Sequence, residues 1–169
     1  MTMSLSRTGA AEHSPRFTTH PRFGRIPAPG HDRFAQPLGD SAFVALRAAY
    51  RSTGGVARGD EIAAWASHKG QGDYLSLNRA IVAGELFSFA WNDTFWLPMF
   101  QFDLHDLSVR PEVRWVLADL GKAFDGWELA VWFAEPNAWL QGRRPVDLLE
   151  TAFPEVVLAA QADLYIATC

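Results

Sequence analysis

Cysteine and long apolar runs are nearly absent from this 169-residue sequence. Its single cysteine, Cys169, is the last residue, which excludes an internal disulfide and any zinc site built from several cysteines, and a reducing cytoplasm is the expected compartment. No stretch approaches the roughly 18 uninterrupted apolar residues of a membrane-spanning helix, so we expect no membrane partner. No apolar run follows Arg7, so a secretory signal is not expected either.

Residues typical of catalysis are also scarce. Outside residues 1–38 the only histidines are His68 and His105, and no motif places either beside a nucleophile and an acid. The Thr-Gly-Gly-Val run at 53–56 lacks the Lys-Ser/Thr of a phosphate-binding loop. The Asp-Leu-His-Asp run at 103–106 offers three possible metal ligands in four residues, but solvated loops commonly have this composition. We therefore expect no catalytic residue, metal or cofactor, and an enzyme is the weakest hypothesis.

What the sequence does contain is enough apolar material for a packed core. Hydrophobic residues make up 49% and charged residues 20% of the chain, with 7 Trp and 12 Phe. This composition excludes disorder over the whole length and suits one compact domain, or a small pair, with a tail. Residues 101–169 hold five basic and eleven acidic side chains. Such an acidic half is not expected to bind a nucleic-acid phosphate backbone. It suits a basic protein partner, or it simply keeps the protein soluble.

Residues 1–38 are predicted to form a flexible arm, because they hold half of the ten prolines and show no apolar periodicity. An Arg-Phe pair occurs three times in this arm, at 16–17, 22–23 and 33–34. These pairs can grip phosphate and stack on bases, or attach the arm to an acidic protein face. They are equally consistent with chance repeats in a disordered leader. The prolines argue against the amphipathic helix of a mitochondrial presequence.

Residues 39–85 are predicted to contain three short helices, over 40–51, 59–68 and 74–83. The first helix would bury Phe43, Leu46, Ala49 and Tyr50, and the second Ile62, Trp65 and Ala66. A glycine-containing turn over 69–73 joins the second and third helices. Two short helices joined in this way have the outline of a helix-turn-helix.

The helix over 74–83 is the candidate for DNA contact. The residues expected to face the core are Leu75, Ile81 and Val82, and those expected to face outward are Ser76, Asn78 and Arg79. Short polar side chains next to an arginine suit contact with base edges and phosphates. The surrounding region is slightly acidic, so the alternative is a helix-turn-helix used only as a scaffold.

A β-hairpin is predicted over residues 86–103. Phe87, Phe89 and Trp91 alternate with Leu86, Ser88 and Ala90, as in a strand whose side chains point to opposite faces in turn. The residues Asn92-Asp93-Thr94 are typical of a turn, and 95–102 would be the returning strand. Pro98 cannot donate to a sheet ladder, so it would mark this strand as an edge or a bulge. A hairpin directly after a helix-turn-helix has the position of a small wing.

The pattern returns to helix in residues 104–169. Helices are expected from Val109 to Gly121, from Trp127 to Ala134, from Pro145 to Thr151 and from Pro154 to Ala167. The predicted fold class is therefore mainly α, with helix-turn-helix-like helices, a short hairpin and a C-terminal helical domain.

Eight large aromatics are more than the core of such a domain needs, so some should be exposed at a protein interface. They are Phe87, Trp91, Trp96, Phe100, Trp115, Trp127, Trp132 and Trp139.

Residues 127–149 contain a tryptophan helix, a Pro-Asn turn, Leu-x-Gly-x-x-Pro and a short helix with Asp-Leu-Leu. The pattern is carried by Trp132, Pro136, Asn137, Leu140, Gly142, Pro145, Asp147 and Leu148. It resembles the toxin-binding domain of Xre/MbcA/ParS-type antitoxins. Residues 98–103, Pro-Met-Phe-Gln-Phe-Asp, also look like a segment of one branch of that family, so the resemblance covers about 86–167. By themselves these prolines, the glycine and Asp147 stop, turn and restart helices, and we expect them to be structural.

The resemblance implies an antitoxin of a type II toxin–antitoxin system that neutralises a RES-type toxin, an enzyme that consumes NAD+ or transfers ADP-ribose. In this family the C-terminal helix and tail cover the toxin's active site, and the helix-turn-helix often represses the shared operon. The corresponding partner-binding residues here are Asp163, Leu164, Tyr165, Ile166, Ala167 and Thr168. The alternative is a stand-alone DNA-binding transcriptional regulator whose C-terminal domain dimerises. A homodimer is expected in either case, because palindromic operators and exposed aromatics both favour one.

Overall fold

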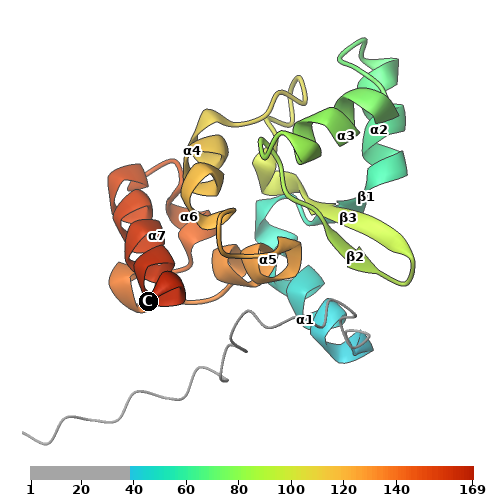
Figure 1. Cartoon of the computed structure of the whole chain (residues 1–169). Coiled ribbons are helices and arrows are strands. Elements are labelled where there is room, and N and C mark those ends of the chain that lie inside the picture. The colour runs from blue at the N-terminus through green and yellow to red at the C-terminus, as the bar shows by residue number, and fades with distance from the viewer. Residues whose placement is uncertain (1–38) are drawn as a thin grey trace, which may run out of the picture. The chain divides into compact units, whose positions relative to one another are not determined.

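The computed structural model describes residues 39–169 (Figure 1). The expectations for the arm and its Arg-Phe pairs lie outside the described residues. The described part is mainly helical with a small three-stranded antiparallel sheet, which confirms the predicted fold class. None of the helices between Gly39 and Cys169 has the length and apolarity needed to cross a membrane.

The elements follow one another in an order close to the predicted one. The α-helices are α1 (Asp40–Ala49), α2 (Gly59–His68), α3 (Tyr74–Val82), α4 (Pro111–Leu120), α5 (Gly126–Ala134), α6 (Pro145–Leu148) and α7 (Phe153–Thr168). The strands are β1 (Val56–Arg58), β2 (Phe89–Trp91) and β3 (Thr94–Pro98), and the 3-10 turns are η1 (Arg51–Thr53), η2 (Met99–Gln101) and η3 (Ala138–Leu140). Helix α6 is shorter than predicted, and the returning strand ends at Pro98, directly before η2.

The predicted hairpin is present and acquires a third strand. Asn92 and Asp93 both have positive φ, 48° and 54°, as a two-residue type I′ turn requires. The sheet order is β1-β3-β2, with β3 in the centre, so the expectation that Pro98 marks an edge strand or a bulge is wrong. Pro98 is tolerated because it is the last residue of β3, and the N–H of Met99 continues the contact by donating to the Gly55 carbonyl at 2.9 Å.

Two expectations about buried residues in α2 and α3 are also wrong. Trp65 is exposed and has the Lys69 ammonium over its ring, 5.1 Å from the centroid. Leu75 and Val82 are 55% and 88% exposed, whereas Leu77 is buried. Leu77 and Ile81 lie one turn apart and set the packed face of α3, which turns Leu75 and Val82 to the opposite side.

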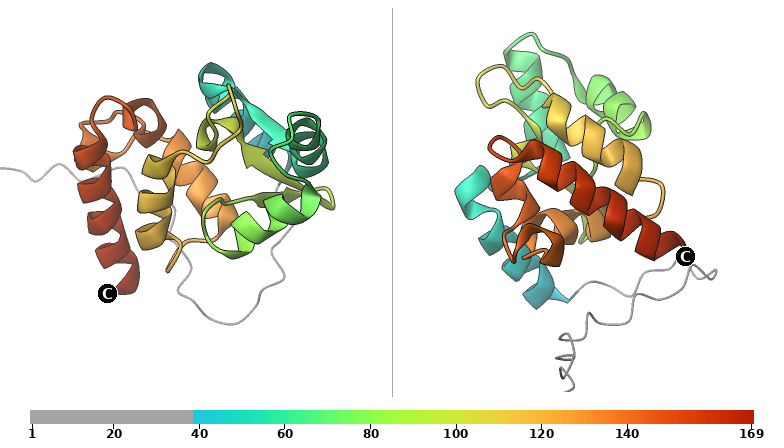
Figure 2. Two further views of the ribbon diagram at one scale, coloured as in Figure 1. Left: turned by 90° about the horizontal axis from the view of Figure 1, so that it is seen from above. Right: turned by 90° about the vertical axis from the view of Figure 1, so that its left-hand side faces the viewer.

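The main core is formed by α1, α4, α5, α6 and α7 together with the segment before β2. Helices α4 and α7 lie side by side in both views of Figure 2. Phe133 of α5 stacks on Phe87, with ring centroids 5.7 Å apart, and contacts Phe100 of η2 at 4.8 Å. The apolar stripe of α4 faces this core, since Val113, Val116, Leu117 and Leu120 are all buried.

A fully buried glutamine joins η2 to the segment before β2. Gln101 Nε2 donates to the carbonyls of Phe87 and Pro98, at 3.0 and 3.2 Å, and the Phe87 N–H donates to Gln101 Oε1 at 2.9 Å. The side chain thus replaces the hydrogen bonds that a strand partner would otherwise supply.

A buried tyrosine joins α1 to α5. The Tyr50 hydroxyl donates to the Ala130 carbonyl at 2.6 Å, and its ring stacks on Phe100 at 5.5 Å. Burial raises the pKa of Tyr50 well above its ordinary value, although the nearby Arg144 guanidinium opposes the shift.

Replacing Gln101 with leucine should destabilise the protein by about 2–4 kcal/mol, because the Phe87 N–H and carbonyl would lose their partner inside the core. The matched control is Gln161→Leu, at an exposed site on α7, where the change should stay within about 0.5 kcal/mol. Urea unfolding of the two variants measures both values, and similar losses would contradict this role of Gln101.

The free energy of unfolding should fall as the pH rises above about 10, because Tyr50 ionises there in the unfolded chain and stays neutral when buried. Its folded pKa is the higher one, so its stabilisation is complete below the unfolded pKa and is lost as the pH rises. Tyr50→Phe should cost about 1 kcal/mol at pH 8, and less at pH 11. Urea unfolding at the two pH values tests this; a constant difference between wild type and variant would refute it.

Candidate protein-interaction site

The motif over residues 127–149 forms a tight corner between α5 and α6. Asn137 caps η3, and its Oδ1 accepts a hydrogen bond from the Trp139 N–H at 2.8 Å. Gln141 and Gly142 both have left-handed φ values, 59° and 78°, so the chain reverses here. The Asn137 N–H then donates to the Arg143 carbonyl at 3.0 Å and closes the corner, before a proline starts α6.

One carboxylate attaches α7 to this corner. Asp163 Oδ2 accepts hydrogen bonds from Trp132 Nε1 and Asn137 Nδ2, both at 2.7 Å, and Asp163 Oδ1 accepts one from Trp139 Nε1 at 3.0 Å. The three donors come from α5, from the turn and from η3. Such charge-assisted hydrogen bonds are stronger than neutral ones, so the position of α7 depends on Asp163.

The six residues predicted to bind a partner therefore differ in their surroundings. Asp163 is half-buried and satisfied within the chain, and Leu164 packs against the core. The Thr168 hydroxyl, although exposed, donates to the Leu164 carbonyl at 2.9 Å. The large side chains that α7 presents to solvent at this end are Tyr165 and Ile166, which are 70% and 60% exposed.

Further exposed apolar side chains surround this end of α7. Leu158 lies on the solvent side of α7, two helical turns before Tyr165. Trp139 adjoins the helix through its contact with Asp163 and is itself 58% exposed. We call Trp139, Leu158, Tyr165 and Ile166 the α7 face. The prediction that some aromatics are exposed is confirmed by Trp139 and by Trp115 on α4.

Most acidic residues of the C-terminal half form ion pairs or hydrogen bonds within the chain. Ion pairs join Arg143 to Glu155 at 2.9 Å, Arg144 to Asp147 at 2.6 Å, Lys122 to Asp119 at 3.1 Å, and Arg110 to Glu150. Asp125 and Glu128 form the capping box of α5. The negative charge near the α7 face is therefore largely compensated by neighbouring cations and N–H donors.

The candidate DNA-binding residues on α3 do not form one polar surface. Ser76 donates its N–H and its hydroxyl to the capping carboxylate of Asp73, and these hydrogen bonds lower the pKa of Asp73. Asn78 is half-buried. Arg79 is exposed, and the helix repeat sets it between the side chains of Leu75 and Val82.

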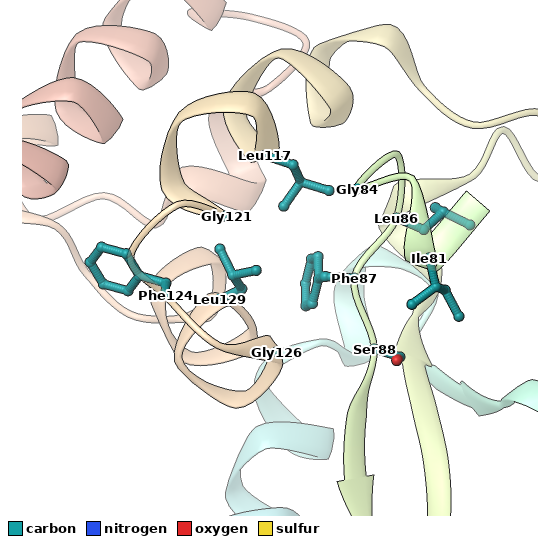
Figure 3. A pocket seen from close by; sticks show the side chains of 10 residues that line it. All are labelled: Ile81, Gly84, Leu86, Phe87, Ser88, Leu117, Gly121, Phe124, Gly126 and Leu129. Carbon is teal, nitrogen blue, oxygen red and sulfur yellow. The ribbon is translucent and has the colours of Figure 1, made fainter. Parts of the chain in front are cut away.

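An apolar depression lies beside the core. It has a volume of about 220 Å³, and Figure 3 shows Leu117, Phe87 and Leu129 converging on it. Its lining residues are Ile81, Gly84, Leu86, Phe87, Ser88, Leu117, Gly121, Phe124, Gly126 and Leu129. None of these side chains titrates, so the lining supplies no acid or base.

The run at 103–106 forms a loop held by its own side chains. Asp103 Oδ1 accepts a hydrogen bond from the His105 N–H, and Asp106 Oδ1 accepts one from the Ser108 N–H, both at 2.8 Å. Across residues 39–169, no three His, Cys, Asp or Glu side chains are grouped as metal ligands would be.

Sequence reasoning missed the role of Asp163, although a signal for it was present. In α7 the buried residues are Val156, Ala159 and Ala160, and Asp163 continues this side of the helix by the 3–4 residue repeat. An acidic residue at a core-facing position requires donors inside the fold. The indoles and the amide of the motif are those donors.

Asp163→Asn should lower the free energy of unfolding by about 1–3 kcal/mol, because an amide has a single acceptor oxygen and its NH2 group would face N–H donors. The control is Glu135→Gln, which neutralises an exposed carboxylate beside the same corner and should change stability by less than about 0.5 kcal/mol. Urea unfolding at pH 7 compares the two; equal losses would exclude the proposed contact.

Comparison with known protein families, with curated proteins and with solved structures gives no match for this chain.

Proposed function

We propose that this protein is the antitoxin of a type II toxin–antitoxin system. It neutralises a RES-type toxin, which consumes NAD+ or transfers ADP-ribose, by covering the toxin's active site with the C-terminal end of α7. The observation that carries this proposal is the α7 face, an exposed apolar surface built beside the antitoxin-like corner.

The composition of the α7 face favours a protein partner. Tyrosine, tryptophan and isoleucine side chains that are mostly exposed contribute little to the chain's own core. Aromatic residues of this kind are enriched in protein interfaces and supply much of their binding energy. Two carboxylates of this region, Glu155 and Asp163, are engaged by Arg143 and by the indoles.

A second candidate function is a DNA-binding regulator, possible because the β2–β3 hairpin directly follows α2 and α3. Arg79 and Ser76 would then contact DNA, and a homodimer would bind a palindromic operator. The acidic Asp60 and Glu61 in the first turn of α2 and the exposed Val82 make this surface less suited to phosphates. A steep decrease of DNA affinity with salt would support this candidate.

The proposed function is tested by co-expression with the adjacent gene's product, followed by pull-down and a growth assay. Tyr165→Ala/Ile166→Ala should weaken binding by tenfold or more and abolish growth rescue, since both side chains belong to the α7 face. The matched control is Leu75→Ala/Val82→Ala, which removes two exposed apolar side chains from α3 and should bind like wild type.

These substitutions are preferable to a truncation at Glu155, which would remove the buried Val156, Ala159 and Ala160 and with them part of the core. If the wild-type chain captures no neighbour and does not rescue growth, toxin neutralisation is rejected. Binding of DNA by the purified chain is then the function to test.

A further inference from the structure

Two indole donors in the β2–β3 hairpin are buried without an acceptor. The Nε1 atoms of Trp91 and Trp96 are shielded from solvent, and within residues 39–169 neither has a hydrogen-bond partner. The two rings lie edge to face, with their centroids 6.2 Å apart. Nearly all buried N–H groups in proteins are paired, because an unpaired one loses its hydrogen bond to water without a replacement. These two donors therefore oppose the closed packing of this region.

Phe43 of α1 packs on both indoles. Its ring stacks on Trp91, with centroids 3.8 Å apart and planes inclined by 8°, and it meets Trp96 edge to face at 5.0 Å. Phe43 is itself only 2% exposed. Its burial and its aromatic contacts favour the closed position of α1. The unpaired donors act in the opposite direction, because separation of α1 from the hairpin would let water reach both N–H groups.

The two ends of α1 are held by different interactions. At the C-terminal end, the Tyr50 hydroxyl donates to the Ala130 carbonyl and Arg144 Nη1 donates to the Ala49 carbonyl, both at 2.6 Å. At the N-terminal end, Gly39 is the cap residue and supplies no side-chain hydrogen bond. The polar side chains of the first turns are exposed, so apolar contact of Phe43 holds this end.

The anchor at the C-terminal end of α1 is itself fixed. Arg144 forms two hydrogen bonds with Asp147, both at 2.6 Å, and a further one with the Ser52 hydroxyl at 3.2 Å. A guanidinium held in this way by a carboxylate keeps a constant orientation toward the Ala49 carbonyl. Helix α1 is thus tied to α5 through Tyr50 and to the start of α6 through Arg144. A movement of α1 would therefore begin at its other end.

We propose that the first turns of α1 form a strap that opens and recloses over Trp91 and Trp96, with the Tyr50 end of the helix as its fixed point. The closed strap predominates because it buries Phe43. It opens more readily than the core unfolds, because opening hydrates two unpaired donors. The open strap brings these aromatic rings to the surface, so it controls access to a surface that the closed protein hides. The strap is independent of the proposed function, since it lies outside the α7 face.

Native-state hydrogen exchange of the full chain, followed by NMR, tests the strap. The indole N–H groups of Trp91 and Trp96 should exchange through the same opening as the amides of residues 44–46. This opening should be populated at least about tenfold more than the opening that exposes the amides of α5. Low concentrations of urea should increase the opening of α5 steeply and that of α1 only slightly, because the strap exposes little surface. Exchange of the two indoles only together with α5, in global unfolding, would overturn the proposal.

Replacing one N–H group separates the effect of the unpaired donor from that of packing. Trp96→benzothienylalanine keeps the size of the ring and substitutes sulfur for the N–H. It should reduce the opening of α1 by about tenfold, because the closed state then buries one unpaired donor fewer. The matched control makes the same replacement at Trp115, whose side chain is 68% exposed, and should leave the exchange of α1 within about twofold of wild type. Faster exchange of α1 in the Trp96 variant would mean that this N–H is paired, and the strap would be refuted.

Discussion

The hydrogen bonds to the Asp163 carboxylate are the contacts on which the C-terminal region depends. Three N–H donors from α5, the Pro-Asn turn and η3 converge on this one side chain. A half-buried carboxylate needs such donors, because removing it from water without hydrogen-bond partners costs free energy. The direction of α7 and the shape of the corner are therefore set together. This contact also explains why the apolar side chains next to it remain available at the surface.

Some residues of the motif hold Asp163 and the corner in place, and others are exposed and available to a partner. Trp132 and Asn137 hold Asp163, while the left-handed Gly142 and the helix-starting Pro145 shape the corner. The exposed α7 face lies beside these supports. Under the proposed function, the partner's contribution would be apolar shape, and the acidic balance of this half of the chain would have little part in the contact. The helix-turn-helix-like region has a comparable arrangement, since α3 also exposes apolar side chains on either side of a single arginine.

Buried polar side chains connect the parts of the main core in a similar way. Gln101 substitutes for a missing strand partner of the segment before β2, and Tyr50 joins α1 to α5 through the Ala130 carbonyl. Each group is paired, and each links segments that are distant in the chain. These hydrogen bonds favour one packing arrangement of the core. A different arrangement could bury as much apolar surface, but it would leave the polar groups of Gln101 and Tyr50 unpaired.

Local chemistry in the sequence determined where most helices begin and end and where the hairpin turns. Pro145 and Pro154 start helices, and Asn92-Asp93 adopts the turn expected of it, because these preferences act over only a few residues. Only the tertiary structure decided which side of α3 is buried, that β1 pairs with β3, and which donors hold the Asp163 carboxylate. Each of these depends on partners far away in the chain: Leu77 rather than Leu75 has a surface to pack against, and the donors to Asp163 come from three other segments.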